Sequence, residues 1–145
     1  MKISEFVLRT LNNRSNNFEK IKVSSVSKKD AELILKETGI DIYNYTHIVD
    51  SFGVRHVMLN HSCISKEKNK GQVAVTVDDF DLIADIVKSF DSVKYGGKNK
   101  AGRDILVYVK KTSNYFFYVE EIRSIKNKEA VIQTMYIKTK KGSND

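Results

Sequence analysis

The sequence contains one cysteine, Cys63, and three histidines among its 145 residues. A single cysteine excludes an intrachain disulfide, and too few other ligands remain for a zinc site of several Cys and His residues at the usual spacing. We therefore expect a reducing compartment and a function that needs no metal and no cofactor.

Long apolar runs are absent as well. The N-terminal residues MKISE lack the apolar stretch of a signal peptide, and no run approaches the roughly 20 apolar residues that cross a membrane. These absences predict a soluble, cytoplasmic protein with no membrane partner.

Positive charge is in excess, because 25 lysine and arginine residues face 18 aspartate and glutamate residues. Such a chain attracts polyanions such as nucleic acid, although membrane surfaces and acidic proteins share that attraction. The length and an apolar fraction of 41% fit one domain with a real core.

Helical periodicity marks the N-terminal half. Apolar residues from Ile3 to Leu11 recur at helical spacing, and the polar run 12–17 that follows is typical of a loop. We therefore assign residues 1–25 to a helix and linker outside the core domain, with a frayed chain end as the other interpretation. Three further helices are predicted from an N-cap residue followed by apolar positions at helical spacing: 27–39, 50–60 and 76–90.

From residue 92 onward the apolar period changes to two, which indicates β-strands. The predicted fold is α+β, with N-terminal helices packed on one face of a four-stranded antiparallel β-meander. The domain is expected to span residues 26–141, with a tail at 142–145. The four strands are joined by short connections that require antiparallel neighbours: 92–95, 103–111, 115–123 and 130–140.

Closing the turn at residues 112–114 symmetrically pairs Val109 with Phe117 and Val107 with Val119. We predict that this face packs against the helices, together with two residues of the last strand, Met135 and Ile137.

The opposite sheet face then presents Tyr108, Tyr118 and Tyr136 beside Glu120. On it, bases could stack against the tyrosines while Glu120 takes a proton, but an ordinary half-solvated sheet face would look the same. A register slip of one residue would instead bring Glu121 and Arg123 forward.

All three histidines lie between residues 47 and 61, and histidine exchanges protons near neutral pH. His56 lies off the apolar stripe of its predicted helix, so it is the better candidate for proton transfer. His61 continues that stripe and could equally be packed at the helix end. His47 precedes the helix, and we assign it a structural role.

The connection GGKNKAGR at residues 96–103 is glycine-rich and basic. It lacks the serine or threonine that follows the lysine of a P-loop, and it joins two strands, so it does not predict nucleoside triphosphate binding. A clamp on an RNA backbone through Lys98, Lys100 and Arg103 fits better, with a solvated hairpin as the other interpretation.

Several short motifs resemble, in order and spacing, the phage-associated barnase/EndoU/colicin/RelE-like (BECR) nuclease domains. Such domains occur at the ends of Mu-type phage head-morphogenesis proteins and in polymorphic toxins. The similarity covers roughly residues 26–140 and implies a metal-independent ribonuclease fold. The motifs are TGID, HIVD, VRH and NH between residues 38 and 61, and GQVAVT, GRDI, YVEEIR and TMY between residues 71 and 136.

The resemblance also implies which residues form the active site: the helix histidines, the glutamate and arginine of the third strand and a hydroxyl of the last strand. In this sequence these are His56, His61, Glu120, Arg123 and Thr134.

We therefore hypothesise a toxin or effector that cleaves RNA by 2′-hydroxyl attack to a cyclic phosphate. It would act in the cytoplasm of a bacterial host or target cell, with RNA as its ligand and an immunity or host protein as a candidate partner. The alternative is an inactive nuclease-fold module that binds nucleic acid or a host protein.

Overall fold

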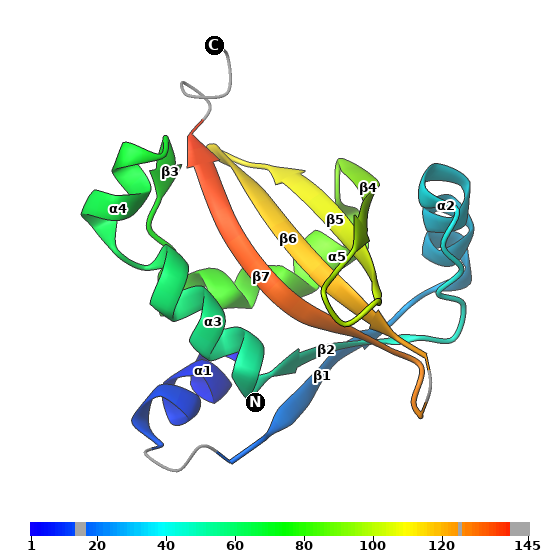
Figure 1. Cartoon of the computed structure of the whole chain (residues 1–145), viewed down its shortest axis with the longest axis horizontal. Helices are drawn as coiled ribbons and strands as arrows, with labels where there is room; N and C mark the ends of the chain where they lie inside the picture. Colours follow the sequence, from blue (N-terminus) through cyan, green and yellow to red (C-terminus); the bar gives the residue numbers. More distant parts are fainter. Residues whose placement is uncertain (14–16, 125, 140–145) are drawn as a thin grey trace.

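The structure is a computed structural model, and it describes residues 1–13, 17–124 and 126–139. Figure 1 shows a twisted sheet with helices around it. The elements in chain order are α1 (Ile3–Asn12), β1 (Lys20–Ser25), α2 (Lys28–Thr38), β2 (Thr46–Asp50), α3 (Ser51–His61), α4 (Ile64–Asn69), β3 (Gln72–Val73), the 3-10 helix η1 (Val77–Leu82), α5 (Ile83–Ser89), β4 (Ser92–Lys98), β5 (Asp104–Lys111), β6 (Asn114–Arg123) and β7 (Glu129–Thr139).

The sheet has the strand order β1-β2-β7-β6-β5-β4, and β3 also pairs with β7. The α+β class and the antiparallel meander β4 to β7 are confirmed, but the prediction of only four strands was wrong. β2 pairs with β7 in parallel, and β1 extends the sheet beyond β2. Pairing between strands so far apart in the chain leaves no local pattern in the sequence, which is why these strands were not placed in the sheet.

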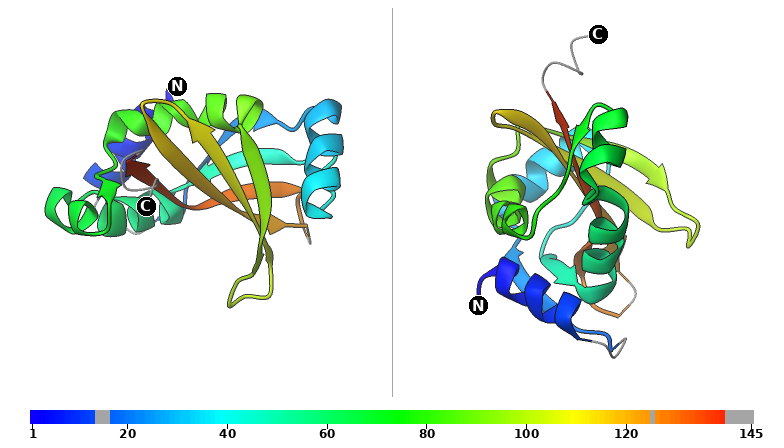
Figure 2. Two further views of the ribbon diagram at one scale, coloured as in Figure 1. Left: turned by 90° about the horizontal axis from the view of Figure 1, so that it is seen from above. Right: turned by 90° about the vertical axis from the view of Figure 1, so that its left-hand side faces the viewer.

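Helices cover one face of the sheet, and the two ends of the β7 edge are paired with β2 and β3. On the covered face α1 packs against η1, α5 against β5 and α2 against β4 (Figure 2). α3 lies along β7 between the two short pairings. The β4–β5 hairpin projects from the opposite face (Figure 2).

Helix α1 and strand β1 belong to this core. Ile3, Phe6 and Val7 of α1 are buried in the same hydrophobic cluster as the sheet, and β1 is a sheet strand. The expected separate helix and linker are therefore part of the packed domain. Residues 14–16 of the predicted loop, and the tail at 142–145, lie outside the described residues.

The predicted register between β5 and β6 is confirmed, but the predicted buried face was wrong. Val109 pairs with Phe117 as expected, yet Tyr108 and Tyr118 are the residues that are fully buried against the helices. A register shift between Val119 and Glu120 also places Met135 opposite Tyr118. Burying the tyrosine rings removes more apolar area from water than burying the valines, which favours this choice of face.

Glu120 therefore points into the core, where it meets His47. The His47 Nδ1 and Glu120 Oε2 atoms are 2.6 Å apart, and both side chains are almost completely buried. Burial, followed by the Glu120 carboxylate, raises the pKa values of the Tyr108 and Tyr118 hydroxyls, so both stay neutral. The structural role expected for His47 fits this contact, while the exposed position expected for Glu120 was wrong.

We predict that Glu120→Ala lowers the free energy of unfolding by about 3–5 kcal/mol, because it leaves the His47 ring buried without its partner. Urea denaturation measures the change. Glu19→Ala is the matched control, since it removes the exposed ion pair of Glu19 with Arg9 at 3.2 Å and should cost at most about 1 kcal/mol. Equal losses in the two variants would contradict a structural role for the buried pair.

Candidate active site

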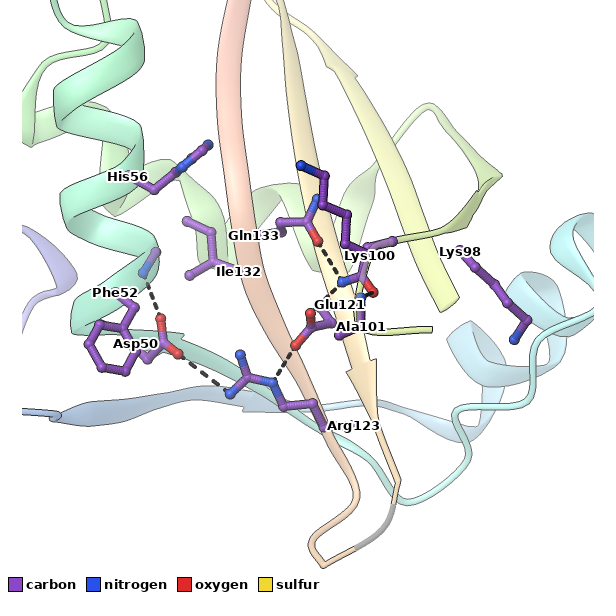
Figure 3. A pocket seen from close by; sticks show the side chains of 12 residues that line it. Asp50, Phe52, His56, Lys98, Lys100, Ala101, Glu121, Arg123, Ile132 and Gln133 are labelled. Atoms are coloured by element: carbon purple, nitrogen blue, oxygen red, sulfur yellow. Dashed lines mark hydrogen bonds and ion pairs between the residues drawn. The ribbon is translucent and has the colours of Figure 1, made fainter. Parts of the chain in front are cut away.

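A cleft of about 770 Å³ opens on the face that α5 does not cover. The start of α3 forms one wall, the β4–β5 hairpin forms the other, and β6 and β7 form the floor (Figure 3). The lining residues are Asp50, Phe52, Gly53, His56, Lys98, Asn99, Lys100, Ala101, Glu121, Arg123, Ile132 and Gln133.

The wall formed by α3 is fixed by a cap and a close contact. Asp50 Oδ1 accepts a hydrogen bond from the Gly53 backbone N–H at 2.8 Å, which caps the helix. A Cβ atom at Gly53 would lie 2.5 Å from Ile132 Cγ2, so only glycine lets α3 approach β7 this closely. His56 lies one turn after this contact, and its side chain extends from α3 toward the cleft (Figure 3).

Glu121 is the centre of the polar network on the cleft floor. Its Oε1 atom accepts hydrogen bonds from Arg123 Nε at 2.6 Å and from Arg103 Nη1 at 3.0 Å. Its other carboxylate oxygen accepts a hydrogen bond from the Asn99 side chain, which also donates to Gln133 Oε1 at 3.1 Å. The carboxylate of Glu121 thus links β6 to the hairpin, and the Asn99 side chain extends the network to β7.

A second carboxylate holds Arg123 from the α3 side. Asp50 Oδ2 lies 3.6 Å from Arg123 Nη1, so the guanidinium is placed between Asp50 and Glu121 (Figure 3). The Arg123 side chain is still one-third exposed. A guanidinium fixed in this way is well placed to bind an anion that enters the cleft.

The hairpin wall carries two lysines on a loop that Asn99 shapes. Asn99 Oδ1 accepts hydrogen bonds from the backbone N–H groups of Ala101 and Arg103, each at 3.0 Å. The flanking residues Lys98 and Lys100 are exposed, and both line the cleft. The loop is therefore ordered by one side chain. Its two cations are exposed, and Lys98 pairs with Asp104 Oδ1 at 3.2 Å.

The surroundings shift three pKa values in the cleft. Partial burial, and then the charge of His61, lowers the pKa of His56 below its ordinary value of 6.5. Burial alone would raise the pKa of Glu121, but hydrogen bonds from Arg123 and Asn99 and the arginine charges lower it overall. Burial raises the pKa of Asp50, against the opposing effects of the Gly53 hydrogen bond and Arg123. Near neutral pH, Glu121 is therefore ionised and His56 is mostly neutral.

Several of the residues predicted from the sequence meet in the cleft. His56, Arg123, Lys98 and Lys100 line it, and Arg103 reaches its floor through the ion pair with Glu121. The remaining predicted residues lie elsewhere. Glu120, Tyr108 and Tyr118 are buried in the core on the other side of the sheet, because adjacent strand residues point to opposite faces.

Three more predicted residues lie outside the cleft lining. The His61 Nδ1 atom is 3.3 Å from Oε2 of the buried Glu67, and the His61 ring packs beside Tyr136 with centroids 5.7 Å apart. The Thr134 hydroxyl is buried with no hydrogen-bond partner within the described part of the chain. The active-site residues implied by the family resemblance are therefore divided between the cleft, the core and the neighbouring sheet face.

The sequence interpretation missed the cleft roles of Asp50, Asn99 and Gln133. Asp50 was recognised only as a helix cap, and its second carboxylate oxygen reaches Arg123. Asn99 lies between Lys98 and Lys100 in a glycine-rich connection, and asparagine is a turn-forming residue, so it could have been identified as a loop-shaping residue. Glu121 was named only as the consequence of a register slip, whereas strand alternation brings it forward in the register observed.

Over the described ranges, no three His, Cys, Asp or Glu side chains gather as metal ligands. No helix found there is long and apolar enough to cross a membrane.

The sequence model of the family described as phage-Barnase-EndoU-ColicinE5/D-RelE like nuclease3 matches residues 24–145. No curated protein and no solved structure matches the chain significantly.

We predict that His61→Gln raises the pKa of His56, because it removes a nearby positive charge. The pKa should remain below 6.5, since burial, the larger cause of the shift, is unchanged. NMR titration of the His56 ring measures both values, and Cys63→Ser, an uncharged change near the same helix end, is the control. An unchanged His56 pKa in His61→Gln would show that the two rings do not interact.

Proposed function

Because the chain belongs to the family of phage-associated barnase/EndoU/colicin E5/D/RelE-like nucleases, we propose that the cleft beside α3 is the active site of an endoribonuclease. The observation that carries the proposal is the convergence of His56, Glu121 and Arg123 from two elements far apart in sequence on one cleft. The hairpin lysines, Lys98 and Lys100, add positive charge to the same cleft. Cleavage of RNA through its own 2′-hydroxyl needs a base, an acid and cations, and this set contains each.

In the proposed reaction Glu121 is the base and His56 is the acid. Glu121 takes the proton of the ribose 2′-hydroxyl, and the 2′-oxygen then forms a bond to phosphorus. The bond from phosphorus to the 5′-oxygen breaks, and His56 gives its proton to that leaving oxygen. The products are a 2′,3′-cyclic phosphate and a free 5′-hydroxyl. We assign the base to Glu121 because its lowered pKa keeps it ionised at neutral pH.

The remaining cleft charges would stabilise the phosphorane transition state. Arg103, Arg123, Lys98 and Lys100 supply four positive charges in or beside the cleft, against three carboxylates: Asp50, Glu121 and Asp104, which pairs with Lys98. Excess positive charge aimed at one position favours the added negative charge on phosphorus. Two carboxylates hold Arg123 at the cleft, and a phosphate that arrives there would compete with Glu121 for its guanidinium.

The alternative is a module that binds RNA or a host protein in this cleft without cutting. An active enzyme of this kind would harm the cell that makes it, so the proposal includes a protective partner, such as an immunity protein, that covers the cleft. High-yield expression of the wild-type chain alone in bacteria would count against the enzyme.

We predict that the purified chain cuts RNA in the presence of EDTA, and that His56→Ala and Glu121→Gln each reduce the rate about a hundredfold to ten-thousandfold. Gel analysis of a labelled oligonucleotide measures the rate. Glu120→Gln is the matched control, because the neighbouring glutamate faces the core and its change should mainly affect stability. Loss of cleavage in Glu120→Gln, with full activity in Glu121→Gln, would reverse the assignment.

A single 2′-deoxy substitution at the cleaved nucleotide should abolish cutting and leave most of the binding, since the phosphate contacts remain. Cutting and binding of the two oligonucleotides are compared at one salt concentration. Equal cutting of both would exclude attack by the 2′-hydroxyl, and equal binding with no cutting of either would support the binding module.

The pH profile should have its optimum on the acid side of 6.5. Activity requires ionised Glu121, so it falls at low pH through a pKa that is lowered from 4.5. It also requires protonated His56, so it falls again as the pH rises through a pKa that is lowered from 6.5. The pH dependence of kcat/KM checks both limbs, and a rate that keeps rising above neutral pH would contradict His56 as the acid.

A further inference from the structure

Beyond the cleft, the open sheet face carries a row of aromatic rings. Phe117 of β6 and Tyr136 of β7 are stacked, with ring centroids 4.9 Å apart and an interplanar angle of 5°. The His61 ring also lies next to Tyr136, at 5.7 Å between centroids. The Lys138 ammonium is 5.2 Å from the Phe117 centroid and 5.9 Å from that of Tyr136.

The row stops at Phe117. The neighbour of Phe117 on β5 is Val109, and the neighbour of Val109 on β4 is Ser92. These side chains are much shorter than an aromatic ring, and Val109 is only partly buried. The side chains beside Phe117 on β5 and β4 are therefore short enough to leave room for one more flat ring against Phe117.

Positive charge surrounds this open space beside Phe117. Lys94 of β4 pairs with Val107 and so lies on the same sheet face, and it is exposed. Lys111 is also exposed, with its ammonium 5.9 Å from the Tyr115 ring centroid. Together with Lys138, these lysines give a flat ligand on Phe117 cations for its attached phosphates.

The aromatic row continues directly from the cleft. On β7, Tyr136 follows the cleft residue Gln133 by three positions, which is about 10 Å along a strand. On α3, His61 follows the cleft residue His56 by five positions, which is about 7.5 Å along a helix. The same two elements therefore border both the cleft and the row.

We propose that Phe117, backed by Tyr136, is a stacking subsite for an unpaired nucleobase of the RNA strand whose phosphate lies in the cleft. The inference rests on the proposed function for the identity of the ligand. An aromatic face accepts any base, whereas a paired base is not free to stack on it. The subsite therefore selects single-stranded or looped RNA over duplex RNA, with little preference for base identity.

The test uses an RNA oligonucleotide with the fluorescent base 2-aminopurine next to the cleavage position, bound to the His56→Ala chain so that it stays intact. Stacking on Phe117 should quench the fluorescence. Adding Phe117→Leu, which keeps apolar bulk but removes the ring, should abolish the quenching and weaken binding about tenfold. Tyr43→Leu is the matched control, because Tyr43 is an exposed aromatic residue in the connection before β2.

A second measurement does not depend on how the variant folds. Replacing the stacked base with an abasic nucleotide should weaken binding to the chain with Phe117 intact by a similar factor. The same replacement should weaken binding to the Phe117→Leu variant little further. Equal quenching in Phe117→Leu and Tyr43→Leu, or no loss with the abasic RNA, would overturn the subsite.

The two proposals fail separately. Cleavage that depends on His56 but not on Phe117 would retain the nuclease and overturn the subsite. Quenching that depends on Phe117, in a chain that cuts no RNA, would retain the subsite and overturn the nuclease.

Discussion

The hydrogen bond between His47 and Glu120 constrains the rest of the structure. It joins β2 to β6 across the intervening strand β7, where the neighbour of His47 is the small residue Ala130. Because strand side chains alternate, fixing Glu120 in the core also fixes Glu121 on the open face. Because β2 continues directly into α3, fixing His47 also positions the Asp50 cap and the helix that carries His56. A slip of β6 by one residue would bury Glu121 and expose Tyr118, so the contact in the core also protects the cleft.

Much of the fold could be predicted from local patterns. The Ser27 cap, the Gly39 stop and the turn between β5 and β6 are encoded by nearby residues, and each lies where the sequence indicates. The face of the sheet that meets the helices could not be predicted in this way. Both faces of β5 and β6 carry apolar residues, and which face is buried depends on the pairing with β7. The register of the β6–β7 pairing shifts between Val119 and Glu120, and no turn rule predicts this shift. The parallel pairing of β2 with β7 likewise depends on contacts remote in sequence.

The candidate site was predicted in part for the same reason. The basic hairpin, and His56 on the polar side of its helix, were identified from the sequence. Both are exposed, so their identification depends little on which sheet face is buried. The choice between Glu120 and Glu121 required the face to be known, and so did the choice between Tyr118 and Phe117. Asp50 and Asn99 could be recognised from sequence as cap and turn residues, but their bonds to Arg123 and Glu121 arise only when distant strands meet.

In the proposed mechanism Glu121 must serve both as an anchor for two arginines and as a base. These roles conflict in the free protein, because cations that lower its pKa also weaken it as a proton acceptor. A phosphate entering the cleft would compete with Glu121 for Arg103 and Arg123. Each arginine that turns toward the phosphate leaves the carboxylate more basic, while Asp50 still holds Arg123 from the α3 side. The base would thus gain strength only when substrate is present, which reconciles an ion-paired glutamate in the resting protein with proton abstraction in the complex.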